Sequence, residues 1–145
     1  MAGEPYPKET QLSRGERRYT RKVASPKRWQ QIIDAKGDEC RICTFIRDHP
    51  ENAAEMGLTL DQDKGLSVSY HHLVPRGIGG SDTEANIVPI WGDGTSGHHG
   101  MVTRRHRGAC TALRRSLTDD EYAYLHETLG EARVEERYPV IWEKP

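Results

Sequence analysis

Histidine is the residue type in this chain that is best suited to chemistry, and its positions are clustered. The chain has seven histidines, and five of them fall within a window of 36 residues that is also rich in glycine. These five are His71, His72, His98, His99 and His106. Imidazole exchanges a proton near neutral pH and is a common ligand of metal ions. The clustering therefore predicts a functional site.

The cysteines indicate a second kind of site. Cys40 and Cys43 form a CxxC pair, and Cys110 stands apart from them. The odd number of cysteines and an N-terminal sequence without an apolar signal segment argue against a disulfide framework. We therefore interpret the close pair as metal ligands and expect an intracellular, cytoplasmic protein. No run of 18 apolar residues is present, so we expect no membrane partner.

The elements that must position these residues can be predicted from local patterns. Ser25 followed by Pro26 is typical of a helix start, and residues 66–70 alternate between apolar and polar as a strand does. Thr118 and Glu121 form a capping-box pair at the start of another helix. The sequence predicts a helix over 26–36, a loop with one helical turn over 50–65, a hairpin of strands 66–70 and 86–91, and helices over 98–107 and 117–129.

The order of these pieces resembles the HNH endonuclease family of the ββα-metal superfamily, especially its small phage-type members. The resemblance covers about residues 26–107 and is carried by the motifs His71-His72-Leu73-Val74-Pro75-Arg76, Gly79-Gly80-Ser81-Asp82, Ala85-Asn86-Ile87-Val88 and Gly92-Asp93-Gly94-Thr95-Ser96-Gly97-His98-His99-Gly100. It implies an α+β fold in which a small ββα-metal core of one hairpin and one helix is flanked by further helices.

The resemblance also implies roles for single residues. His72 corresponds to the general base of the family, and His71 and His99 correspond to ligands of one divalent ion: Mg²⁺, Mn²⁺, Ni²⁺ or Zn²⁺. Asn86 corresponds to the middle letter of the motif, which braces the loop. Successive side chains of a regular strand point to opposite faces. His71 and His72 can therefore serve one site only where the strand ends or twists.

Two departures from the family pattern concern metal ligands. Some relatives carry a further histidine at the position that Thr103 occupies here, and His106 lies too far along the expected helix to replace it. Relatives also pair the CxxC with two later cysteines, whose positions hold Trp91 and His98. Cys40, Cys43 and His98 then leave a structural zinc with three ligands, and Cys110 is one source of a fourth. The alternative is a degenerate site of reduced thiols filled by Trp91.

Charge divides the chain into segments despite a net charge of only −1. Residues 8–36 hold nine Lys and Arg against three acids, whereas residues 118–136 hold seven acids against one Arg. We predict a flexible basic arm over 1–24, a nuclease domain over 25–110 and an acidic helical extension over 111–145. The basic residues expected to contact the phosphates of double-stranded DNA are Arg76, Arg104, Arg105 and Arg107.

The leading hypothesis is a metal-dependent endonuclease that nicks or cuts double-stranded DNA. The short form of the domain suggests, by analogy, a phage setting with terminase subunits as partners. One alternative is a non-catalytic, zinc-containing module that binds nucleic acid, and another is a restriction or homing-type nuclease. Leu, Ile, Val and Phe make up only 25 of 145 residues, so bound metal is expected to contribute to the stability of the folded chain.

Overall fold

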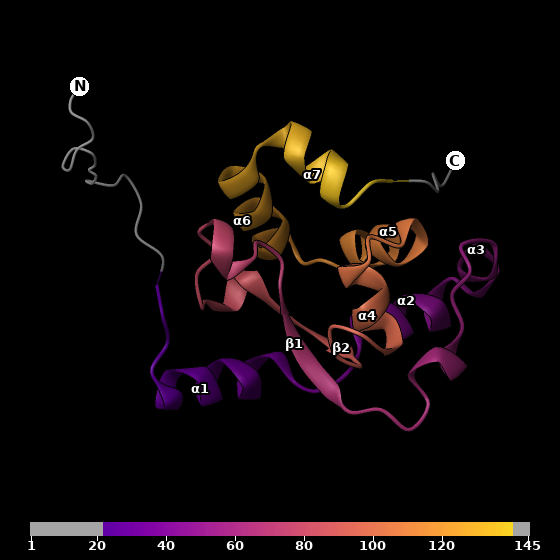
Figure 1. Ribbon diagram of the computed structural model, residues 1–145, viewed down its shortest axis with the longest axis horizontal. Helices are drawn as coiled ribbons and strands as arrows, with labels where there is room; N and C mark the ends of the chain where they lie inside the picture. The colour runs from indigo at the N-terminus through magenta and orange to yellow at the C-terminus, as the bar shows by residue number, and fades with distance from the viewer. Residues whose placement is uncertain (1–21, 141–145) are drawn as a thin grey trace.

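The computed structural model describes residues 22–140, which form helices around a single β-hairpin (Figure 1). In chain order the elements are α1 (Pro26–Lys36), α2 (Arg41–Asp48), α3 (Pro50–Glu55), the 3₁₀ turn η1 (Leu60–Asp63), β1 (Val68–His72), the 3₁₀ turns η2 (Arg76–Ile78) and η3 (Glu84–Asn86), β2 (Ile87–Trp91), α4 (Gly97–Thr103), α5 (Arg107–Arg115), α6 (Asp119–Leu129) and α7 (Glu131–Arg137). This arrangement confirms the α+β class.

The hairpin pairs β1 with β2 in antiparallel register from Val68 opposite Trp91 to His72 opposite Ile87. The predicted hairpin is therefore confirmed, although β1 begins and ends two residues later than expected. This shift puts both histidines of the pair on the last two positions of the strand. Pro89 is accommodated because a sheet of two strands has only edge strands.

Capping explains why two helices begin where the sequence predicts. The Ser25 hydroxyl accepts a hydrogen bond from Arg28 N at 3.1 Å at the start of α1. Thr118 and Glu121 form both hydrogen bonds of the capping box at the start of α6. Gly130 ends α6 at a φ of 86°, a left-handed value that glycine adopts without steric cost.

Two predictions about helices are wrong. Residues 41–48 form α2, where the sequence predicts the CxxC without a helix, and the loop predicted over 50–65 with one helical turn contains α3 and η1. Helix α2 is eight residues long and buries Ile42, Phe45 and Ile46, so tertiary packing stabilises a segment too short to give a clear signal. The helix expected over 98–107 is instead split into α4 and α5 at Arg105, whose φ of 63° is incompatible with a continuous helix.

One apolar core spans the expected boundary between residues 110 and 111. Leu113, Leu125, Val134 and Tyr138 belong to the same buried cluster as the residues of β2 and α2. A buried ion-pair group adds to this contact, because the Glu121 carboxylate binds both Arg41 and Lys36. The C-terminal helices are thus packed into the fold. The predicted basic arm lies outside the described residues except for Lys22–Ala24.

No helix within residues 22–140 combines the length and the apolar character that crossing a membrane requires.

Candidate metal centres and active site

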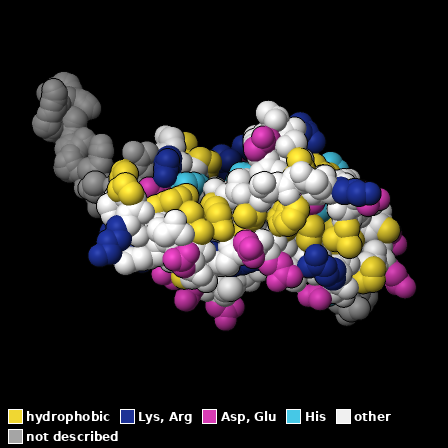
Figure 2. Space-filling view, turned by 90° about the horizontal axis from the view of Figure 1, so that it is seen from below, with side chains coloured by type: hydrophobic (Ala, Val, Ile, Leu, Met, Phe, Trp, Pro, Cys, Tyr) yellow, Lys and Arg dark blue, Asp and Glu magenta, His cyan; other side chains and the backbone are white. Residues whose placement is uncertain are grey.

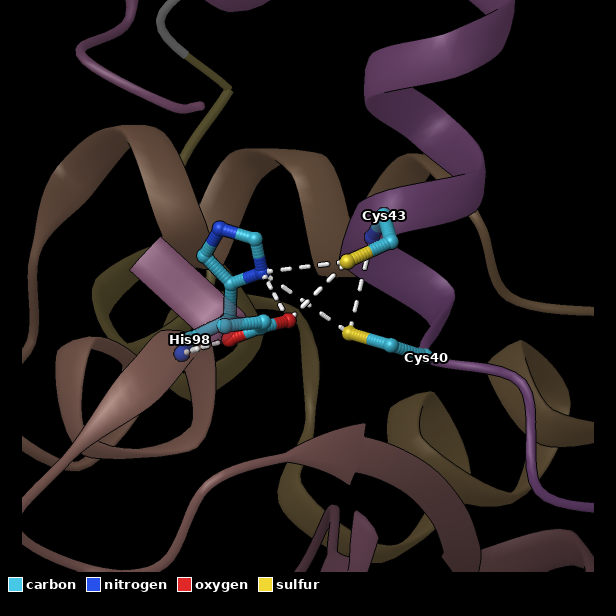
Figure 3. A group of neighbouring side chains, drawn as sticks. Cys40, Cys43 and His98 are labelled. Atoms are coloured by element: carbon cyan, nitrogen blue, oxygen red, sulfur yellow. Dashed lines mark hydrogen bonds and ion pairs between the residues drawn. The ribbon is translucent and has the colours of Figure 1, made fainter. Parts of the chain in front are cut away.

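Four buried side chains meet where α2, η1 and α4 converge, and we call them the four-ligand cluster. Its members are Cys40, Cys43, Asp63 and His98, whose ligand atoms all lie within 4.8 Å of one another. Figure 3 shows both thiols pointing toward the His98 ring. Cys40 caps α2 and Cys43 lies in its first turn, so the geometry of the helix start brings both sulfurs to one side. The cluster could hold a metal ion.

The distances from His98 to the two sulfurs of the four-ligand cluster fit a tetrahedral ion. His98 Nδ1 lies 3.8 Å from Cys40 Sγ and 3.7 Å from Cys43 Sγ. Ligands at metal bonds of ~2.0–2.3 Å are separated by about 3.3–3.8 Å along a tetrahedral edge. The Asp63 carboxylate is closer, at 2.7 Å from His98 Nδ1 and 2.9 Å from Cys43 Sγ. These are hydrogen-bond distances, so Asp63 would have to retreat slightly to become the fourth ligand.

Surrounding groups orient His98 for metal binding. Its Nε2 lies 2.9 Å from the carbonyl oxygen of Thr59, which can only accept a hydrogen bond. Nε2 therefore carries a proton and Nδ1 faces the other ligand atoms. A hydrogen bond from the second ring nitrogen to a backbone carbonyl is the usual way in which a ligating histidine is fixed.

The metal-free four-ligand cluster holds protons that a metal ion would displace. The hydrogen bond from the Cys43 thiol lowers the pKa of Cys40 to about 6, and that same interaction, together with burial, raises the pKa of Cys43. Burial would lower the pKa of His98, but hydrogen bonds to Asp63 and Cys40 outweigh it and raise this pKa to about 9. Metal binding at neutral pH is thus coupled to proton release.

The structure brings together Cys40, Cys43 and His98, the three ligands predicted for a structural zinc. The suggested fourth ligand, Cys110, is wrong, because its Sγ faces the carbonyl oxygen of Val102 at 3.8 Å in the core. Asp63 takes this place instead. It was missed because it lies in a segment predicted to be a loop, where a single aspartate carries no distinctive signal.

A second group of residues lines a pocket of about 460 Å³ at the end of β1, and we call it the histidine pocket. Its basic lining consists of His71, His72, His99, Arg76, Arg105 and Arg137, and no Asp or Glu among residues 22–140 lines it. The two histidines of the pair open onto the same pocket because β1 ends at His72. His71 and His72 can therefore serve one site, as the sequence allowed only where the strand ends or twists.

His71 and His99 face each other within the histidine pocket. Nδ1 of His71 lies 3.3 Å from Nε2 of His99, and the two rings are nearly perpendicular, at 86°. Burial lowers the pKa of His71 to about 3, and burial also lowers the pKa of His99. Both rings are thus neutral at pH 7, the protonation state in which imidazole ligates a metal.

His72 is oriented by an aspartate for which no role was predicted. Its Nε2 lies 2.8 Å from Asp82 Oδ1, and its ring stacks on Trp29 with centroids 5.9 Å apart. Asp82 also accepts hydrogen bonds from the Arg76 guanidinium and from Ala24 N at 3.0 Å. Burial would raise the pKa of Asp82, but these hydrogen bonds lower it to about 2, so the carboxylate is ionised.

Asn86 is not among the residues that line the histidine pocket. Its fully buried amide accepts a hydrogen bond from Val74 N at 2.7 Å and donates to Val74 O and Ser81 O. These bonds fasten the loop after β1 to the start of β2. They are the contacts that the implied bracing role requires.

The four arginines predicted to bind DNA do not lie together. Arg76 and Arg105 line the histidine pocket, whereas Arg104 and Arg107 are not among its lining residues. Arg104 instead reaches the carbonyl oxygen of Thr95 at 3.4 Å. The left-handed backbone of Arg105 is unusual for a residue with a side chain, and such strain is concentrated at functional sites.

Three further residues differ from their predicted roles or were not predicted at all. His106 belongs to the histidine cluster that predicts a functional site, but it caps α5 by accepting a hydrogen bond from Ala109 N at 3.1 Å. Arg137 and Tyr138 line the histidine pocket from the end of α7. Both lie in the acidic extension, where the overall composition gave no reason to expect site residues.

The chain matches no protein-family model, no curated protein and no solved structure.

Proposed function

We propose that the protein is a metal-dependent endonuclease of the HNH type that hydrolyses phosphodiester bonds of double-stranded DNA. One observation carries the proposal: the histidine pocket combines a pair of facing imidazoles, a third oriented imidazole and arginines, with no carboxylate in its described lining. Hydrolysis of a phosphodiester needs a base for water and positive charge near the phosphate. The pocket offers residues for both tasks.

In this proposal, His72 takes the proton from the attacking water. The ionised Asp82 accepts the hydrogen bond from Nε2–H of His72, which leaves Nδ1 with the lone pair that a general base needs. Trp29 and Asp82 together restrict the rotation of the ring. His72 therefore needs no rearrangement of its partners before it accepts a proton.

His71 and His99 would hold the divalent ion. Their facing nitrogens are 3.3 Å apart, close to the ~3.0–3.4 Å that separates adjacent nitrogen ligands at bonds of about 2.1 Å. A bound divalent ion supplies positive charge that stabilises the oxyanion developing during hydrolysis. Two protein ligands leave positions free for water and phosphate oxygens. Imidazole ligands suit Mn²⁺, Ni²⁺ or Zn²⁺ besides Mg²⁺.

Arg76 and Arg105 would bind phosphates of the DNA backbone. The acidic residues are segregated from the histidines on the face seen in Figure 2, where most Asp and Glu side chains lie on one side of an apolar band and the visible histidines lie on the other. A DNA strand at the histidine pocket would thus avoid most of this negative charge, and local fields govern polyanion binding more than net charge does.

The four-ligand cluster supports a second candidate function, a zinc-containing module that binds nucleic acid without cutting it. A closed site with four protein ligands is typical of structural zinc. Under this alternative, the histidine pocket would bind phosphate only, and His72→Ala would leave all measurable properties except local packing unchanged.

A plasmid assay distinguishes the two functions. Supercoiled plasmid is incubated with the protein and Mg²⁺, Mn²⁺ or Ni²⁺, in parallel with EDTA and with the His72→Ala variant. The nuclease proposal predicts conversion to nicked or linear DNA that both controls abolish. Cleavage that survives both controls would defeat the mechanism, and DNA binding without cleavage under any metal would favour the binding module.

A further inference from the structure

The end of α7 brings one residue of the C-terminal helices into direct contact with a proposed metal ligand. Tyr138 follows the last residue of α7 and is 2% exposed. Its phenol oxygen lies 2.7 Å from the carbonyl oxygen of Leu73 and 3.0 Å from His71 Nε2. The phenol thus joins the C-terminal helices to the end of β1.

The protons in this chain of contacts can be assigned by elimination. The Leu73 carbonyl has no proton to give, so the phenol of Tyr138 donates its only proton there. The same phenol can then only accept from His71, which requires the proton of the neutral His71 ring to sit on Nε2. Nδ1 of His71 is left as an unprotonated nitrogen that faces His99.

The same elimination applies to His99 on the other side. The Ser69 hydroxyl donates its proton to the carbonyl oxygen of Gly92, and it also contacts Nδ1 of His99. Nδ1 of His99 must therefore be the donor, and Nε2 of this ring is also unprotonated. Two nitrogen lone pairs thus face each other at 3.3 Å with no proton between them, an arrangement that a cation would satisfy.

We infer that Tyr138 is a positioning residue that holds His71 in the tautomer and orientation needed to bind the metal ion of the histidine pocket. The inference rests on the proposed metal site. It makes the C-terminal helices part of the active site, although they contribute no ligand. Partners of this kind typically change metal affinity about 10- to 100-fold when they are removed.

The test compares Mn²⁺ affinity in the zinc-loaded full-length protein and its Tyr138→Phe variant by isothermal titration calorimetry. We expect the variant to bind Mn²⁺ at least ~10-fold more weakly. Tyr122→Phe is the matched control, because this tyrosine lies on α6 and its hydroxyl contacts Arg114 at 3.4 Å, away from the histidine pocket. Unchanged affinity in Tyr138→Phe, or an equal loss in Tyr122→Phe, would overturn the inference.

A second measurement uses the wild-type protein and does not depend on whether the variant folds. A two-bond ¹H–¹⁵N spectrum of the imidazole rings distinguishes the two tautomers of metal-free His71. The inference requires the proton on Nε2, and a proton on Nδ1 would overturn it.

These results separate the inference from the proposed function. Weaker Mn²⁺ binding by Tyr138→Phe supports the inference even where the wild-type protein fails to cut DNA. DNA cleavage by a Tyr138→Phe variant with wild-type Mn²⁺ affinity overturns the inference and leaves the nuclease proposal intact. Failure of the wild-type protein to bind Mg²⁺, Mn²⁺ or Ni²⁺ at the histidine pocket overturns both.

Discussion

Two adjacent residues of α4, His98 and His99, belong to two sites of opposite character. His98 points into the four-ligand cluster, where every ligand atom is buried and already has protein partners. His99 points into the histidine pocket, where two imidazoles face each other beside open space of about 460 Å³. Closed sites with four protein ligands are structural, and sites that leave positions open are catalytic. One short helix would therefore couple a stabilising metal to a reactive one.

Electrostatics separates the two sites in the same way. In the four-ligand cluster, the hydrogen bonds to Asp63 and Cys40 overcome burial and raise the pKa of His98. In the histidine pocket, burial lowers the pKa of His71, and it lowers the pKa of His99 despite the opposing charge of Asp93. Without metal, the first site holds protons that a metal ion would displace, whereas the facing imidazoles of the second are neutral at pH 7. The predictions below test this contrast, from the largest expected effect to the smallest.

Removal of the proposed base should have the largest effect on activity. We expect His72→Ala to lower the rate of plasmid cleavage about 10²–10⁴-fold, the usual contribution of a general base. The metal content of both sites should stay unchanged, because His72 is a ligand in neither. The control is His126→Ala, on α6 and outside both sites. A wild-type rate of cleavage by His72→Ala would show that His72 is not the base and would contradict catalysis at the histidine pocket.

Disruption of the four-ligand cluster should affect stability first. Cys40→Ser should lose its zinc, and its free energy of unfolding should fall by ~4 kcal/mol or more, because loss of a structural metal belongs to the most damaging class of changes. Elemental analysis and thermal unfolding measure the two effects. Cys110→Ser is the matched control, since this buried cysteine lies outside the cluster. Equal zinc content in Cys40→Ser and wild type would show that the cluster holds no zinc.

The partner of the base should matter less than the base itself. Asp82→Asn keeps the size of the side chain but removes the ionised acceptor of His72. Hydrogen bonds to charged groups contribute ~1.5–3 kcal/mol, so we expect kcat to fall about 10- to 100-fold. Mn²⁺ affinity should remain that of the wild type, which distinguishes loss of base orientation from general damage. A fall in Mn²⁺ affinity with unchanged kcat would contradict this role.

Proton release on metal binding should differ between the two sites at pH 7. The pKa of His98 in the metal-free cluster is raised to about 9, so His98 is protonated below that pH and must lose its proton when zinc binds. Zinc affinity should therefore rise with pH toward 9, and the raised pKa of the Cys43 thiol extends this rise beyond pH 9. The pKa of His71 is lowered to about 3, so Mn²⁺ displaces no proton there. Calorimetry in buffers of different ionisation enthalpy measures both; proton release by Mn²⁺ but not by zinc would reverse the comparison.

The smallest effect is expected for a single arginine of the histidine pocket. Arg105→Ala should weaken DNA binding and reduce the dependence of log K on log salt concentration by about one. Arg107→Ala is the comparison, because Arg107 is not among the residues that line the pocket. Fluorescence anisotropy with labelled DNA at several salt concentrations measures the slopes. Identical slopes for the two variants would show that Arg105 contributes no more to DNA binding than an arginine outside the pocket lining.

The family resemblance implied that His71 and His99 meet, and the two rings do face each other. This was possible because hairpin and helix start are local structures with clear sequence signals. The partners that orient these rings were not predicted: Asp82 lies only ten residues after His72, and Tyr138 comes from a distant segment. Single aspartates and tyrosines are common, and only the packing of the whole chain places them. Asp63 was missed for the same reason.

The helices show the same difference between elements with local sequence signals and elements that depend on tertiary packing. Helix α1 was predicted at its observed bounds, because its N-cap serine, the proline after it and its C-terminal glycine all lie within the segment itself. Helix α2 was not predicted, because its stability depends on burying Ile42, Phe45 and Ile46 against other elements. The break at Arg105 also had no signal, since an arginine in left-handed conformation is not expected from local preference.

The central claim is that the two sites bind metal for different purposes. The four-ligand cluster would bind a metal that stabilises the fold, and the histidine pocket would bind a metal that takes part in the chemistry. The most direct test begins with zinc-loaded protein from which all other metal has been removed. Plasmid cleavage and thermal unfolding are then followed as Mn²⁺ is added to the wild type and to His71→Ala. We predict one zinc per chain and a nearly constant Tm throughout, with cleavage that appears on Mn²⁺ addition in the wild type alone. Full cleavage by the zinc-loaded protein before Mn²⁺ is added, or equal cleavage by His71→Ala, would contradict the claim.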